Sequence, residues 1–66
     1  MDPLACLLRA ADALSAGDHH EACNALDDYY DWRNAGGFEP TTASGQRGDD
    51  YADELVRQAR KLRRAS

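Results

Sequence analysis

The chain has 66 residues, which is enough for one domain at most. Its formal net charge of −4 argues against a general nucleic-acid binder, whose affinity comes largely from neutralisation of phosphates by Lys and Arg. No apolar run approaches the roughly 20 residues of a membrane span, and the start lacks the basic segment of a secretory signal. The composition therefore predicts a cytoplasmic protein without a membrane segment.

The large aliphatic side chains are few for a self-sufficient core. A chain of this size is marginally stable and usually gains stability from disulfides, a metal or oligomerisation. We therefore expect a homo-oligomer or a complex with another protein. The large aliphatic residues are Leu4, Leu7, Leu8, Leu14, Leu26, Leu55, Val56 and Leu62.

A first helix is predicted over residues 3–16. Asp2 is a good N-cap, and Pro3 suits the first helical position, where its missing N–H costs nothing. Apolar residues then recur at helical spacing until Gly17 stops the run. A helix this apolar must be covered on more than one side, which favours self-association. The residues expected at that interface are Leu7, Leu8 and Leu14.

A second helix is predicted over residues 19–35. Asp18 and Glu21, three positions apart, form a pair like a capping box at its start. The short link at Gly17 favours an antiparallel hairpin of the first two helices.

A third helix is predicted over residues 50–64, after a Gly-, Thr- and Ser-rich loop at 36–48. Its acids precede its bases, which matches the helix dipole, and Asp53 and Arg57 are spaced for an intrahelical ion pair. The loop is long enough to carry this helix to either side of the hairpin. The sequence therefore predicts an all-α fold, a single helical domain over 1–66 in which an antiparallel hairpin and a third C-terminal helix form a small, oligomeric bundle.

No metal site, cofactor or enzymatic activity is predicted. His19, Cys23 and Asp27 follow one helical row, but a structural zinc site needs four ligands and no second Cys or His pair exists. In a hairpin folded about Gly17, Cys6 and Cys23 are offset by roughly 7–8 Å along the axis, too far for a disulfide. Both are expected to be thiols that pack as small apolar residues. The chain also lacks a recognisable nucleophile–base pair or phosphate-binding loop.

Two acids break a local rule of helix stability. Asp27 and Asp31 are like charges four positions apart, near the end of a helix where negative charge is disfavoured. Three arrangements remain open: an ion pair with a base of the third helix, plain exposure to solvent, or a basic partner. The bases in question are Arg57, Arg60 and Lys61.

Aromatic residues gather beside these acids. Trp32 serves equally well as a core residue or as the anchor of a protein partner, since Trp is enriched at binding hot spots. Phe38 follows a glycine pair that marks a helix stop, and it is expected to fold back on the hairpin. The predicted partner-binding surface comprises Asp27, Asp28, Asp31, Trp32, Gly36, Gly37 and Phe38.

Two segments carry a resemblance. Residues 31–40 read Asp-Trp-Arg-Asn-Ala-Gly-Gly-Phe-Glu-Pro, and residues 48–55 read Gly-Asp-Asp-Tyr-Ala-Asp-Glu-Leu. Together they resemble a pattern in small accessory proteins of bacteriophages and prophages, where a Tyr-x-x-Trp-Arg…Gly-Gly-Phe-Glu-Pro segment precedes a charged terminal helix. Here Tyr29 takes the first place of that pattern. The resemblance covers the C-terminal half of the chain and implies a phage origin and a place in the host cytosol. It implies no mechanism, since most such proteins have no known function.

The function predicted from these features is protein binding: a phage-type accessory protein docks on a host or phage protein and modulates its activity, for example as an inhibitor. The alternative is a dimeric nucleic-acid-associated protein that uses the basic C-terminal helix, although the net charge speaks against it. A purely structural subunit is a third option. The bases available to the alternative are Arg57, Arg60, Lys61, Arg63 and Arg64.

Overall fold

The computed structural model describes residues 2–65, so the predicted domain limits Met1 and Ser66 lie outside the described residues. The chain forms three helices, α1 (Pro3–Ser15), α2 (His19–Asn34) and α3 (Gly48–Ala65). Between residues 2 and 65 there is no β-strand, only an isolated antiparallel bridge between Thr41 and Arg47. The predicted all-helical fold is confirmed.

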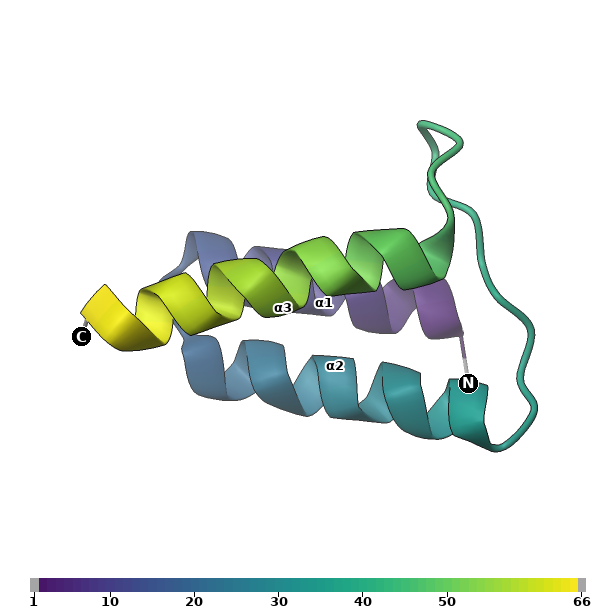
Figure 1. Cartoon of the computed structure of the whole chain (residues 1–66), viewed down its shortest axis with the longest axis horizontal. Coiled ribbons are helices and arrows are strands. Elements are labelled where there is room, and N and C mark those ends of the chain that lie inside the picture. Colours follow the sequence, from purple (N-terminus) through teal and green to yellow (C-terminus); the bar gives the residue numbers. More distant parts are fainter. Residues whose placement is uncertain (1, 66) are drawn as a thin grey trace.

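The three helices lie side by side, and each contacts both of the others (Figure 1). The C-terminal end of α3 lies at the end of the molecule where α1 is joined to α2, and the long connection from α2 to α3 runs along the opposite end (Figure 1). The bundle is elongated, with extents of 34 × 24 × 15 Å. No helix within the described residues has the length and apolar character needed to cross a membrane.

Local capping fixes the ends of the first two helices. The side chain of Asp2 accepts a hydrogen bond from the Leu4 amide at 3.1 Å, and that of Asp18 accepts one from the Glu21 amide at 3.1 Å. Gly17 closes α1 with φ of 75°, and Gly36 closes α2 with φ of 90°. Both closures are Schellman motifs, in which glycine takes the left-handed conformation at no steric cost.

Helix α3 starts at Gly48, two residues before the predicted start. The side chain of Glu39 accepts a hydrogen bond from the Asp49 amide at 3.1 Å. The Pro40 carbonyl accepts one from the Gly48 amide at 2.8 Å. The connection between α2 and α3 therefore supplies the N-terminal cap of α3. The capping groups belong to Glu39 and Pro40, which lie too far back in the sequence to be recognised as a local cap.

Leu7, Tyr29 and Leu55, one from each helix, are at most 2% exposed, and Leu26 is buried in the same core at 4%. Small residues let the helices approach closely at the remaining contacts. Those buried completely are Ala10, Ala22, Ala25 and Ala52.

The structure separates the three leucines that were expected at a self-association interface. Leu7 lies in the core of its own chain with no exposed surface, so it is not available to a second copy. Leu8 is 56% exposed, and Leu14 is partly buried against the core. Neighbouring helical positions point about 100° apart. Cys6 and Leu7 share the inward side of α1, and Leu8 lies beyond its edge.

This separation predicts opposite outcomes for two adjacent substitutions. Leu7→Ala empties a fully packed site and should lower the free energy of unfolding by about 2–5 kcal/mol. Leu8→Ala removes a side chain that is mostly in water and should change it by less than about 0.5 kcal/mol. Urea denaturation followed by circular dichroism measures both, and equal losses for the two variants would contradict the described packing.

Candidate protein-binding surface

An ion pair between Arg33 and Asp49 joins the last turn of α2 to the first turn of α3. The guanidinium donates to both carboxylate oxygens, from Nε to Oδ1 and from Nη2 to Oδ2, each at 2.9 Å. Its third nitrogen, Nη1, donates to the Gly37 carbonyl at 2.7 Å. The Tyr29 hydroxyl donates to Oδ1 of Asp49 at 2.6 Å. We call the set of Tyr29, Arg33 and Asp49 the clamp.

The clamp changes the acidity of its members. The Arg33 guanidinium, followed by the Tyr29 hydroxyl, lowers the pKa of Asp49 from its ordinary 3.8 to about 2. Burial raises the pKa of Tyr29, and its hydrogen bond to Asp49 raises it further. The same carboxylate raises the pKa of Arg33. Asp49 therefore stays deprotonated and accepts the hydrogen bonds, whereas Tyr29 and Arg33 stay protonated and donate them.

A second set of contacts ties the connection to the clamp. Glu39 accepts the Asp49 amide through Oε2 and the Arg47 side chain, at 3.2 Å, through Oε1. The segment leaving α2 is therefore attached both to Arg33, through Gly37, and to the start of α3. Sequence reasoning did not find this network. Its one signal was Arg33, an isolated base among acids just before a glycine pair.

Two aromatic side chains, Trp32 and Phe38, pack on each other beside the clamp, at the end of α2. Trp32 is half-buried, and its indole Nε1 donates to the Phe38 carbonyl at 3.1 Å. The Trp32 and Phe38 rings meet edge to face, with centroids 5.6 Å apart at 90°. Phe38 nevertheless remains 64% exposed, so it folds back on Trp32 rather than into the core. A Cβ atom at Gly37 would collide with the indole, so the turn needs glycine there.

The three predicted acids of α2 have different surroundings. Asp28 accepts a hydrogen bond from Arg9 at 2.8 Å, and Arg9 also pairs with Glu21 at 3.0 Å, so this acid is neutralised within the chain. Asp27 and Asp31 are exposed, and no ion pair joins either of them to a base of α3. Of the three predicted acids, Asp27 and Asp31 therefore make no ion pair with another described residue.

The predicted partner surface is thus divided. Its exposed part holds Asp31, Phe38 and Gly36, with Trp32 and Gly37 half-buried beneath them. Asp27 lies one turn earlier and borders a separate hollow of about 230 Å³ between α2 and α3.

That hollow also receives His19 and Cys23, which face Arg60 and Arg63 across it. Cys23 is exposed, which corrects the expectation that both cysteines pack as apolar residues, whereas Cys6 is buried in the core. Both thiols are free. Within the described residues no group of three or more His, Cys, Asp or Glu side chains is arranged to hold a metal ion.

Comparison of the chain with models of known protein families, with curated proteins and with solved structures found no match in any of the three.

The clamp makes stability depend on pH in a defined window. The pKa of Asp49 is lower in the folded protein, about 2, than its ordinary 3.8, so its contribution is complete above about pH 4 and is lost as the pH falls toward 2. At pH 7, Asp49→Asn should lower the free energy of unfolding by about 1 kcal/mol, a value reduced for the partial exposure of the carboxylate.

The matched control is Asp50→Asn, because Asp50 is exposed and makes no ion pair within the described residues. Denaturant unfolding at several pH values measures the difference from the unmodified protein. For Asp49→Asn this difference should shrink below pH 4, and for Asp50→Asn it should stay small throughout. A constant difference from pH 7 to pH 2 would show that Asp49 titrates normally.

Proposed function

We propose that this chain is a small phage-type accessory protein that docks on a host or phage protein and alters its activity. The docking surface consists of Asp31, Trp32, Phe38 and the turn at Gly36 and Gly37. The observation that carries the proposal is an exposed phenylalanine held in a fixed position: Phe38 is 64% exposed although its ring packs on Trp32 and its carbonyl accepts the indole N–H.

This arrangement suits binding for an energetic reason. A side chain that orders only on binding costs conformational entropy, whereas one that is already supported does not. Trp32 and the clamp support the backbone on both sides of Phe38. An exposed aromatic ring on such a base fits an apolar pocket of a partner, where burial of aromatic surface provides most of the affinity.

The unpaired acids add a preference for a basic rim. Asp31 adjoins Trp32, and Asp27 lies one helical turn away with its charge also unpaired. Lys or Arg residues around the partner's pocket would relieve the repulsion between these two carboxylates. They would also steer the encounter, which makes the association rate sensitive to salt.

The proposal also includes the arrangement of the first two helices and the origin of the chain. The antiparallel hairpin of α1 and α2 is supported by the short link between them and by Arg9, which reaches both Glu21 and Asp28. The phage origin, and with it a place in the host cytosol, is supported by the segment from Tyr29 to Pro40.

The proposal predicts that Phe38→Ala weakens partner binding without unfolding the protein. Immobilised wild type, Phe38→Ala and Leu8→Ala are incubated with host lysate, and captured proteins are identified by mass spectrometry. Leu8→Ala is the matched control, because Leu8 is a comparably exposed apolar residue on α1, away from the aromatic pair. A protein retained by wild type and by Leu8→Ala, and lost with Phe38→Ala, is then purified. Its Kd should rise about thirtyfold for Phe38→Ala, which corresponds to about 2 kcal/mol.

Two results would count against this function. If capture is the same for Phe38→Ala as for wild type, the aromatic pair is not the docking surface. If the double variant Asp27→Asn with Asp31→Asn leaves both affinity and its salt dependence unchanged, the acids are only a solvated face.

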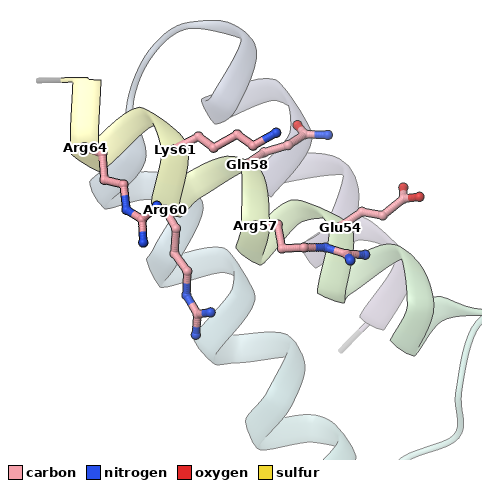
Figure 2. Close-up of a pocket in the computed structure, with 6 residues that line it drawn as sticks. All are labelled: Glu54, Arg57, Gln58, Arg60, Lys61 and Arg64. Atoms are coloured by element: carbon pink, nitrogen blue, oxygen red, sulfur yellow. The ribbon is translucent and has the colours of Figure 1, made fainter.

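The second candidate, nucleic-acid binding, is favoured by one observation. Four bases, Arg57, Arg60, Lys61 and Arg64, extend from α3 in different directions (Figure 2). All four are exposed, and none forms an ion pair with another described residue. Glu54 borders the same surface, however, and the net charge of −4 repels a polyanion.

We therefore expect no binding of duplex or single-stranded oligonucleotides at about 0.15 M salt, near physiological ionic strength. A gel-shift titration checks this. A clear shift at that salt concentration, abolished by Arg60→Ala with Arg64→Ala, would place nucleic-acid binding ahead of protein binding.

A further inference from the structure

The outward face of α3 changes the sign of its charge halfway along the helix. Ala52, Leu55 and Ala59 point into the core, and the charged residues lie on the opposite side at helical spacing. Acids come first, at Asp50, Asp53 and Glu54. Bases follow on the same face, at Arg57, Arg60, Lys61 and Arg64, and all seven residues are exposed. We call these seven residues the charged face.

Within residues 2–65 these charges make no ion pairs. The ion pair expected between Asp53 and Arg57 is not formed, and no residue of the charged face pairs with another described residue. Asp53 accepts only a long hydrogen bond, 3.4 Å, from the Tyr30 hydroxyl. The charged face therefore keeps both signs of charge available to a second molecule.

The charged face is also hollowed. Figure 2 shows the side chains around Arg57 and Lys61 fanning away from α3, and they border an open hollow of about 660 Å³ that includes Glu54. A second hollow, of about 300 Å³, has Val56 beside Asp53 and Arg60. Side chains of a partner can enter between these residues, and Val56 adds an apolar contact near the middle of the face.

We propose that two copies of this chain pair through the charged face, with their α3 helices antiparallel about a two-fold axis. The acidic and basic groups are centred about eight residues apart, roughly 12 Å along the helix at 1.5 Å per residue. An axis beside Val56 and Arg57 would set Arg60 of one copy level with Asp53 of the other, and Arg64 level with Asp50. Such an interface is self-complementary, as a two-fold dimer requires.

A second copy fits the charged face better than a nucleic acid does. Phosphates would be attracted by one half of the face and repelled by the other, where Asp50, Asp53 and Glu54 lie. An antiparallel copy matches both halves and also opposes the two helix dipoles favourably. Because exposed ion pairs contribute little each, the dimer is weak and sensitive to salt.

The dimer does not use the proposed partner surface. The charged face belongs to the outward side of α3, whereas Trp32 and Phe38 lie at the end of α2 and in the connection that follows. Dimerisation and partner binding can therefore fail independently. A dimer would present two copies of Phe38 and bind a dimeric partner with avidity.

The test uses charge reversal in the full chain, without any partner. One variant carries Arg60→Glu and Arg64→Glu, and a second carries Asp50→Lys and Asp53→Lys. A third carries all four changes, which reverses the sign of both partners in each proposed pair, Asp53 with Arg60 and Asp50 with Arg64. Sedimentation equilibrium is run at about 50 mM and about 500 mM salt, where the Debye length falls from roughly 14 Å to 4 Å. Circular dichroism checks that each variant keeps its helix content.

Wild type should dimerise at low salt, with Kd rising at least about tenfold at high salt. Each double variant should be monomeric alone, their equimolar mixture should form a heterodimer, and the four-change variant should dimerise again. A wild type that stays monomeric at 50 mM salt and high protein concentration would overturn the proposal. So would a dimer that both double variants retain, because it would use another surface such as Leu8.

Charge reversal places bases near the start of α3 and acids near its end, which opposes the helix dipole. If a double variant therefore loses helix content, the neutral pair Arg60→Gln with Arg64→Gln replaces it and should still weaken the dimer. Oligonucleotide binding is measured on the same samples. A monomeric wild type that binds an oligonucleotide, and loses this binding with Arg60→Glu and Arg64→Glu, would assign the charged face to nucleic acid instead.

Discussion

The ion pair between Arg33 and Asp49 is the contact on which the rest of the molecule depends. It joins the end of α2 to the start of α3, two points that are 16 residues apart in the chain. A bidentate pair fixes orientation as well as distance, because the guanidinium and the carboxylate must be coplanar to share two hydrogen bonds. Through Gly37 the same guanidinium holds the turn that positions Phe38. One interaction therefore ties the start of α3, which also packs on both other helices, to the turn that carries the aromatic surface.

The clamp and the apolar core share Tyr29. Its ring is completely buried between the helices, and its hydroxyl reaches Asp49. In a core made largely of alanines, one tyrosine provides much of the buried area. Displacing Asp49 would leave the Tyr29 hydroxyl without its partner, so loosening the clamp also penalises the core. This coupling explains how so few large aliphatic residues can hold three helices together.

The sequence predicted local features well and long-range contacts poorly. Caps at Asp2 and Asp18 and stops at Gly17 and Gly36 act within a few residues, so α1 and α2 end within one residue of the predicted positions. The choice between Leu7 and Leu8 for the core depended on where the other helices pack. Two ion pairs join residues far apart in the sequence: Arg9 with Asp28, 19 positions apart, and Arg33 with Asp49, 16 positions apart. The sequence alone did not indicate which of several acids each base would pair with. The aromatic composition indicated the candidate surface, but the exposure of Phe38 required the structure.

The distribution of paired and unpaired charges separates structural from functional surfaces. Arg9 and Arg33, the bases of the first 39 residues, are both used to join helices, and they neutralise Glu21, Asp28 and Asp49. Asp31 beside the aromatic pair, Asp27 one helical turn earlier, and the charged face of α3 remain unpaired within the described chain. Because unpaired charges on a helix surface do little for folding, their grouping at two separate places is not explained by stability. One group adjoins an exposed aromatic ring and the other is complementary to itself, which is why we assign the first to a foreign partner and the second to a copy of the chain.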